Sequence, residues 1–434
     1  MTDLRSAALR QHGELPWPHA SDDIWRRTDV SLLDPQNGFT IADGPGLLQS
    51  VKLTDRELAH YTNPLADEHL LVRADGAWVQ QKVPAGIIVE ELAKASGERA
   101  ERIKPLLESQ DLTPAERKLT SLNAAFHGDA FIIEIPAGFT SQTPIRLVRL
   151  LSAKAQSALF PLTVIVVGKG AQVQIIHEDV SLAPEQERLA PHLINGRIEL
   201  QLEPGAIAHY SRIQRWGLGA REFLLQRASL QQDAQLTMAN INLGAGLSKT
   251  HVIAKLLGRG SSSKVFGFVF GHGQQHIDFH SLQDHQAPQT TSDLLYKAAL
   301  KDSSRLIYTG LIRIAKAAKQ TNAYQANHNL LLSQRSTAET VPMLEILADD
   351  VACKHGATVG PVDEEQLFYL RSRGVPHAWA ERLLVMGFVE PIIEHVPFEP
   401  LRQRLRDELD SGLHGTNGHG AGSEPRQGQT LIWG

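Results

Sequence analysis

Residues 170–175 read GAQVQI, a turn-forming pair followed by an alternating strand, and this pattern returns along the middle of the chain. The further copies are residues 205–210 (GAIAHY), residues 233–238 (DAQLTM) and the more degenerate residues 260–265 (GSSSKV). Their starts lie 35, 28 and 27 residues apart, a spacing typical of a solenoid in which each turn buries its face against the next. The repeat favours a parallel β-helix over an antiparallel sandwich, because simple hairpins would repeat at shorter intervals.

Short apolar or alternating runs, punctuated by Gly, Ser, Asn and Asp, continue on both sides of this repeat. They predict a β-helix core over residues 127–360 and a fold class that is mainly β. A Rossmann fold and a TIM barrel are disfavoured, because no helical pattern alternates with these strands.

A mainly helical N-terminal domain is expected over residues 1–126. Its clearest element begins at Thr113, a good N-cap, with Pro114 in the first helical position and Glu116 completing a capping box. This helix is expected to run to about Phe126.

Helices are expected again after the core, in a C-terminal domain of residues 361–410. Asp363 can cap a helix over residues 364–373, and further helices are predicted over residues 378–388 and 399–409. Residues 411–434 are rich in Gly, Ser, His and charge, which predicts a disordered tail.

The composition narrows the possible functions. A net charge of -5 offers no general attraction to nucleic acid. No apolar run approaches the roughly 20 residues of a membrane-spanning helix. The N-terminus lacks a secretory signal, so the cytoplasm is the expected location. Cys353 is the only cysteine, which excludes an internal disulfide and a cluster site made of several thiolates from this chain.

Common catalytic motifs are missing from the sequence. We find no H-E-x-x-H, no G-x-S-x-G and no G-x-G-x-x-G after a strand. Residues 244–250 (GAGLSKT) resemble a phosphate loop, but the glycine directly before the lysine is absent. The sequence therefore predicts no enzymatic activity and no catalytic residue.

One segment is rich in histidine, with His272, His276, Asp278, His280 and His285. On a strand, His276, Asp278 and His280 would share one face and offer two imidazoles and a carboxylate to a divalent metal. The alternative is a polar outer face of the β-helix, which we favour because neighbours on one strand seldom complete a coordination sphere.

A second candidate site surrounds the single cysteine. If the segment is extended, Asp349, Cys353 and His355 lie on one face, and Lys354 favours the thiolate. Thiol, imidazole and carboxylate groups are suitable ligands for iron. Alternatively, Cys353 is a small buried hydrophobe and His355 caps a turn.

The C-terminal half carries a recognisable series of blocks. They are residues 322–333 (NAYQANHNLLLS), 342–346 (PMLEI), 349–351 (DDV), 355–360 (HGATVG) and 367–374 (LFYLRSRG). Their order and spacing resemble the signature of the SufB/SufD family of iron–sulfur cluster assembly scaffolds (SUF system). The match is dense over residues 303–387 and thinner over residues 275–292 and 23–28. The FYLRSRG form and the single cysteine resemble the SufD branch, because SufB usually has a Cys and a Gln in this block and further cysteines elsewhere.

This resemblance implies a right-handed parallel β-helix flanked by N-terminal and C-terminal helical domains. It also implies a heterodimer with SufB through the β-helix, and docking of the ABC-type ATPase SufC on the C-terminal helices. The docking residues expected by analogy are Asp363, Leu367, Phe368, Tyr369, Arg371 and Arg373.

The resemblance places Cys353 and His355 near the assembly site, at the interface with SufB, where iron or a cluster would bind transiently. No cofactor is expected to be held stably by this chain alone. The expected function is that of a scaffold in a SufB–SufC–SufD complex. The alternatives are a SufB-like homodimer and a free-standing β-helix enzyme acting on polysaccharide.

Overall fold

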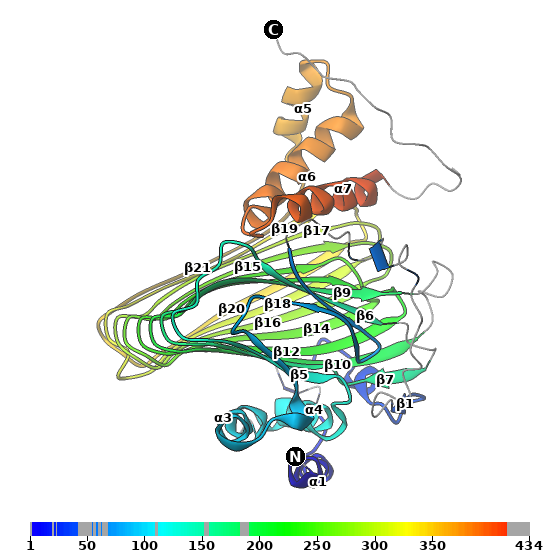
Figure 1. The fold of residues 1–434 in the computed structure, drawn as a ribbon. Coiled ribbons are helices and arrows are strands. Elements are labelled where there is room, and N and C mark those ends of the chain that lie inside the picture. Colours follow the sequence, from blue (N-terminus) through cyan, green and yellow to red (C-terminus); the bar gives the residue numbers. More distant parts are fainter. Residues whose placement is uncertain are drawn as a thin grey trace.

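The centre of the molecule is a parallel β-solenoid, whose successive turns each add one strand to two facing sheets (Figure 1). This confirms the mainly β fold and the parallel coil that the repeat predicted. The computed structural model describes residues 2–414 except 20, 23, 42–53, 55–57, 60–61, 63–67, 109–111, 152–155 and 183–190.

The strands fall into two sheets, which we call sheet A and sheet B. Sheet A follows the order β20 (Thr337–Ile346), β18 (Arg305–Ile314), β16 (His276–His285), β14 (Leu247–Leu256), β12 (Ala220–Leu230), β10 (His192–Leu202), β8 (Leu162–Val167), β5 (Ala130–Ile135) and β4 (Ile88–Glu91), with β7 (Ser157–Leu159) beside β10 and β1 (Thr40–Ile41) beside β7. Sheet B follows the order β21 (Val351–Pro361), β19 (Thr321–Leu331), β17 (Thr291–Leu300), β15 (Ser262–Gly271), β13 (Gln235–Asn242), β11 (Ile207–Arg215), β9 (Gln172–Ser181), β6 (Ile145–Leu151), β2 (His69–Ala74) and β3 (Ala77–Lys82).

A ladder of tight corners runs along the solenoid. Each corner residue has a left-handed backbone, and its N–H donates to a carbonyl at the equivalent place in the next turn, as from Gly170 to Pro204 at 3.0 Å. Glycine adopts this conformation without steric cost, which explains why the repeat usually begins with it. The corner residues are Gly138, Gly170, Gly205, Asp233, Gly260, Gln289 and Gln320. Four of them are the first residues of the four repeat copies.

The main core lies between the two sheets. Alternate residues of each strand point inward, and their side chains stack from turn to turn. The largest include Tyr210, Phe279, Tyr296 and Tyr308, all of which are buried. This continuous apolar stack stabilises the solenoid along its length.

The region of residues 1–126 contains strands as well as helices. Its helices are α1 (Thr2–Glu14), α3 (Gly97–Glu108), α4 (Pro114–Phe126) and the 3₁₀ turns η1 (Val30–Leu33) and η2 (Leu92–Lys94). The capping box at Thr113 and the end at Phe126 are confirmed for α4. Strands β2, β3 and β4 were not predicted, because this region was expected to be mainly helical. They pair with the solenoid. In β3 and β4 the pairing is antiparallel, so these strands end both sheets.

The C-terminal helices are α5 (Glu364–Ser372), α6 (His377–Ile393) and α7 (Glu399–His414). The second half of α6 and the apolar face of α7 pack on the outer face of sheet B, while α1, α3 and α4 lie toward sheet A (Figure 1). Helix α7 includes residues 411–414, which the sequence analysis assigned to a tail, and residues 415–434 lie outside the described residues. The division of the chain into separate domains stays a prediction.

Candidate functional site

The last turn of the solenoid, formed by β20 and β21, is covered on one side only. Within the described residues, β20 pairs with β18 and β21 pairs with β19, and each ends its sheet. Leu344 and Ile346 of β20 are 38% and 41% exposed, whereas their partners Ile312 and Ile314 in β18 are fully buried. The same kind of position is therefore buried where a further turn covers it and exposed where none does.

Two further apolar side chains are exposed on the same last turn. Leu347 follows β20 and is 60% exposed, and Val359, toward the far end of β21, is 43% exposed. We call Leu344, Ile346, Leu347 and Val359 the end patch. Its strands also present unpaired backbone edges, a feature that favours pairing with another chain.

Cys353 and His355 lie on β21, close to the end patch. Cys353 is half-buried and packs with Ile312, Ala323 and Val351 at the end of the core. Burial raises the pKa of its thiol, which opposes the effect expected of Lys354 in the isolated chain. His355 is two residues further along the strand and is exposed. The structure therefore brings these two predicted residues to one edge, with the thiol protonated at neutral pH.

Asp349 does not join them on the strand. It lies in a bend before β21 begins at Val351, because the chain turns there between the two sheets. Among the described residues, neither Cys353 nor His355 belongs to a group of three ligand-bearing side chains close enough to hold a metal ion. Any ion bound at this edge would need further ligands from elsewhere.

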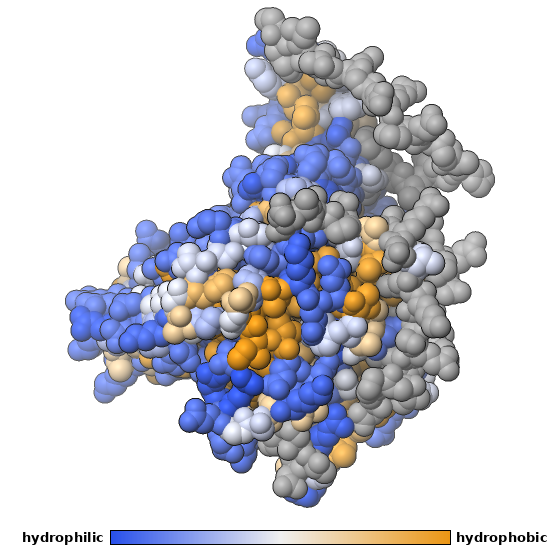
Figure 2. Space-filling model, viewed as in Figure 1, coloured by the Kyte–Doolittle hydropathy of each residue, from blue (hydrophilic) through white to orange (hydrophobic). Residues whose placement is uncertain are grey.

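A second exposed apolar area lies on the projecting C-terminal helices. Phe368 and Tyr369 of α5 are 72% and 58% exposed, and Trp379 and Leu383 of α6 are each 51% exposed. We call these four residues the helical patch. Figure 2 shows hydrophobic residues gathered where α5 projects from the molecule.

The remaining predicted docking residues have structural contacts of their own. Asp363 caps α5, because its carboxylate accepts hydrogen bonds from the backbone N–H of Glu365 and Gln366. Leu367 is buried with Val362 and Ala380. The Arg373 guanidinium lies 5.4 Å from the Tyr369 ring centre, and Arg371 lies in the last turn of α5. Asp363 and Leu367 therefore hold the helix that presents the helical patch.

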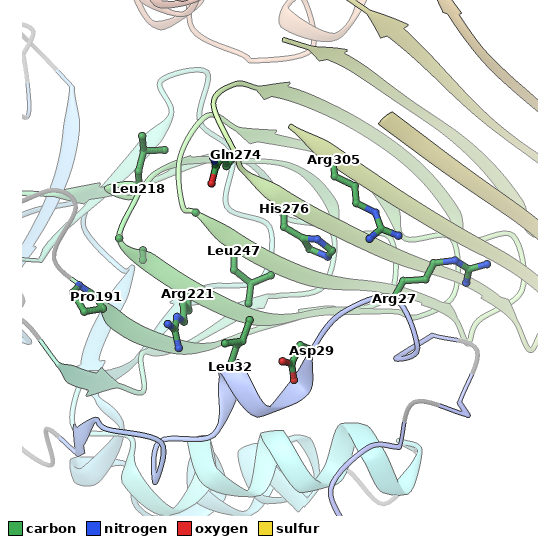
Figure 3. Close-up of a pocket in the computed structure, with 13 residues that line it drawn as sticks. Arg27, Asp29, Leu32, Pro191, Leu218, Arg221, Leu247, Gln274, His276 and Arg305 are labelled. Atoms are coloured by element: carbon green, nitrogen blue, oxygen red, sulfur yellow. The ribbon is translucent and has the colours of Figure 1, made fainter. Parts of the chain in front are cut away.

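A polar cavity of about 730 Å³, which the sequence did not predict, lies between the η1 segment and sheet A (Figure 3). Arg27, Arg221 and Arg305 line it together with Asp29, so its wall carries more positive than negative charge. His276 also lines it, and burial lowers the pKa of its imidazole. Arg27 and Arg305 both contact the Glu339 carboxylate, at 2.8 and 2.6 Å. No local motif predicted this cavity, because its walls come from distant parts of the chain.

The histidine-rich segment forms β16, and its side chains have separate surroundings. His276, Asp278 and His280 share the outer face of the strand, as predicted, but they do not converge on one point. Thr28 contacts both His276 and Asp278, at 3.1 and 2.5 Å, whereas His280 lies beside His251.

His285 of β16 lies between Thr290 and Ser292, with ring nitrogens 2.7 and 2.9 Å from their hydroxyl oxygens. Burial lowers its pKa to about 4. The imidazole is therefore neutral near pH 7 and serves as a buried hydrogen-bonding group.

The fold and its uncovered last turn define the chain as a β-solenoid protein with one open end. A family model described as "SUF system FeS cluster assembly, SufBD core domain" matches residues 150–388, more than half of the sequence. The chain belongs to the SufBD family of iron–sulfur cluster assembly proteins.

Relatives of similar length share this family name. The chain is 25% identical over 427 residues to an iron–sulfur cluster assembly SufBD family protein of Staphylococcus haemolyticus, covering 95% of this chain and 90% of the relative. A counterpart from Staphylococcus saprophyticus is 27% identical with the same coverage. One from Staphylococcus aureus is 28% identical over 331 residues, covering 76% of this chain and 70% of the relative. In the described part of the chain, no helix has the length and apolar character to cross a membrane.

Proposed function

We propose that the chain is a SufD-type scaffold subunit of a cytoplasmic SufB–SufC–SufD complex and assists iron–sulfur cluster assembly without catalysing a reaction itself. Membership of the SufBD family supports the cluster-assembly role. The single cysteine supports the SufD branch, because one thiol cannot hold a cluster alone. The right-handed coil implied by the sequence resemblance is part of this proposal.

The end patch is the observation that carries the proposal. Side chains that are fully buried at Ile312 and Ile314 are replaced one turn later by Leu344 and Ile346 at about 40% exposure. A partner β-helix such as SufB, placed on this end, would cover these side chains and pair with the free strand edges.

The helical patch supports docking of SufC. Phe368, Tyr369, Trp379 and Leu383 are exposed on helices whose base is fixed to sheet B by α6 and α7. Aromatic side chains on a rigid support are the usual anchors of protein interfaces. Nucleotide hydrolysis in SufC could then move the scaffold through α6.

Cys353 and His355 would supply two ligands for transient iron or a nascent cluster at the interface with SufB. The thiol is protonated in the isolated chain, and binding of a metal would displace its proton. The remaining ligands would come from SufB, since the described residues of this chain supply no third ligand there.

Native mass spectrometry of the complex, co-purified with SufB and SufC, tests both surfaces together. We expect one SufB, one copy of this chain and two copies of SufC. Leu344→Asp should remove SufB and leave one SufC, because a charge cannot be buried at the end patch. Phe368→Ser should retain SufB and remove one SufC.

Leu257→Asp is the matched control, because Leu257 is 39% exposed and lies away from the end patch, in the turn after β14. It should leave the complex intact. Retention of SufB by Leu344→Asp would overturn the end-patch interface. A stable homodimer that assembles a cluster without SufB would instead support the SufB-like alternative.

Iron content tests the proposed metal ligands. In complexes purified without oxygen, His355→Ala should lower the bound iron several-fold and leave the subunit composition unchanged. His328→Ala is the control, because His328 lies on the neighbouring strand β19 and is occupied by a hydrogen bond to Thr358 at 2.8 Å. Equal iron in both variants and the wild type would remove His355 from the site.

A further inference from the structure

A buried group of three ligand-bearing side chains lies where α4 meets the outer face of sheet A. Glu116 comes from the first turn of α4, His251 from β14 and His280 from β16. His251 and His280 are direct partners on adjacent parallel strands, and their ring centres are 4.8 Å apart. Three distant segments of the chain thus bring one carboxylate and two imidazoles to a single point.

The geometry of this group fits a metal ion. One ligand atom from each side chain lies within 4.8 Å of the other two. Glu116 Oε1 is 3.0 Å from His251 Nδ1. Two donor atoms bound to one tetrahedral ion at 2.0–2.1 Å are about 3.3 Å apart. An ion could therefore replace the proton between Glu116 and His251 with little movement, and the His280 ring would move inward by up to about 1.5 Å to complete the set.

Each of the two imidazoles has one ring nitrogen without a hydrogen-bond partner among the described residues. His251 and His280 are 0% and 7% exposed, yet Nε2 of His251 and Nδ1 of His280 have no hydrogen-bond partner among the described residues. An unsatisfied buried polar atom costs about 1–3 kcal/mol. An ion on the Nδ1 side of His251 could satisfy the open nitrogen of His280 but not Nε2 of His251. The small exposure of His280 offers a route for entry.

Further hydrogen bonds and ring contacts hold Glu116 and His251 in place. The other carboxylate oxygen of Glu116 accepts hydrogen bonds from the Thr113 backbone N–H at 2.9 Å and from its hydroxyl at 2.7 Å. The ring of His251 packs against Trp25 and Phe223, with ring centres 5.1 and 5.5 Å away. Such supporting contacts are typical of metal sites, because they fix the orientation of the ligands.

The neighbouring charges allow a cation to bind. The positive charge of Lys249 acts on both histidines, and its ammonium is 2.6 Å from the Asp278 carboxylate and 2.6 Å from the Ile24 carbonyl. The charges of Lys249 and Asp278 therefore offset each other. The cluster itself then contributes the negative charge of Glu116.

We propose that Glu116, His251 and His280 bind one divalent first-row transition-metal ion, of the class of Zn²⁺ or Fe²⁺, between α4 and sheet A. One carboxylate and two imidazoles are a common ligand set for these ions, and water completes the coordination. The ion holds α4 to the solenoid. This site lies away from Cys353 and His355 and does not depend on the proposed scaffold role.

Titration with Co²⁺ tests the site. Co²⁺ can take the place of Zn²⁺, and it absorbs visible light strongly when it is four-coordinate. The full chain, stripped with a chelator, should bind one equivalent of Co²⁺ with visible absorption, and Zn²⁺ should displace it. Saturating Zn²⁺ should also raise the melting temperature. Glu116→Gln and His280→Gln should each weaken binding at least about 100-fold.

His285→Gln is the matched control, since His285 is a buried histidine on the same strand whose nitrogens are already hydrogen bonded. This variant and His355→Ala should bind Co²⁺ like the wild type. If His280→Gln does not fold, His280→Cys keeps a ligand and should add a sulfur-to-cobalt absorption band. Absence of stoichiometric Co²⁺ binding in the wild type, or equal affinity in Glu116→Gln, would overturn the proposal.

Discussion

A buried charge network holds the two sheets together near the N-terminal end of the solenoid. Asp179 of β9 lies 3.4 Å from the Arg149 guanidinium and 2.7 Å from that of Arg212. Arg212 reaches across the core to Glu222 of sheet A at 2.5 Å, and Arg149 reaches Asp129 at 2.9 Å. All five side chains are nearly inaccessible to water. Asp179 therefore compensates two buried positive charges at once.

The ionised state of Asp179 is strongly favoured. Burial alone would raise the pKa of its carboxyl, but His177, Arg212 and Arg149 outweigh burial and hold the pKa far below the ordinary value. The carboxylate is thus charged throughout the physiological range, and its removal leaves an imbalance that a proton cannot correct.

We predict that Asp179→Asn destabilises the protein by about 3 kcal/mol. Breaking a buried ion pair costs about 3–5 kcal/mol, because the partner's charge remains in a medium of low polarity. We expect the lower end of this range, since Arg149 keeps Asp129 and Arg212 keeps Glu222. Adding Arg212→Met to Asp179→Asn should lower the stability further, because it removes the ion-pair partner of the buried Glu222 carboxylate.

Urea unfolding of the full chain, followed by tryptophan fluorescence, measures this loss. Glu345→Gln is the control, because it removes a carboxylate whose partner Arg313 is 3.0 Å away in an exposed pair. Exposed pairs contribute no more than about 1 kcal/mol. If Asp179→Asn lowers the free energy of unfolding no more than Glu345→Gln does, the buried network does not stabilise the fold more than an exposed ion pair.

Two further predictions concern stability. The folded-state pKa of His285 is about 4, below the ordinary value of 6.5. The neutral imidazole therefore stabilises the fold fully above pH 6.5. This stabilisation, about 3 kcal/mol, is lost as the pH falls toward 4. Urea midpoints at pH 7 and pH 4.5 should differ less in His285→Gln than in the wild type, and an unchanged pH dependence would contradict this. Gly205→Ala should cost about 1 kcal/mol, because Gly205 has a φ of 69°, and Gly205→Asn should cost less. Equal urea midpoints for the wild type and Gly205→Ala would show that the backbone at this corner accepts an alanine side chain without strain.

The corners show how far the sequence could predict the solenoid. Gly170, Gly205 and Gly260 mark turns by residue type alone, and their spacing indicates the coil. Gln289 and Gln320 adopt the same backbone conformation, but glutamine carries no local preference for it. Their conformation is imposed by stacking on the preceding corners, so no short motif could have revealed these turns.

The polar sites were less predictable, for a similar reason. The capping box of Thr113 and Glu116 is local, and the sequence predicted it correctly. That the same Glu116 carboxylate contacts His251, 135 residues away, depends on how α4 lies on sheet A. The strand pattern likewise put His276, Asp278 and His280 on one face, but it could not show which side chains from other segments lie over that face.

The two ends of the solenoid differ, and this difference bears on how many copies can associate. At one end, the short strands β3 and β4 run antiparallel to their neighbours, and β3 carries a polar edge in residues 80–82 (QQK). At the other end, β20 and β21 continue the parallel order and carry the end patch. A solenoid with two open ends could add subunits without limit and form a filament. Val79 of β3 and Ile88 of β4 are also exposed, so the antiparallel pairing and not a lack of apolar side chains distinguishes this end. If only the parallel end stacks, association through the solenoid would stop at two subunits, which is what the proposed pair with SufB requires.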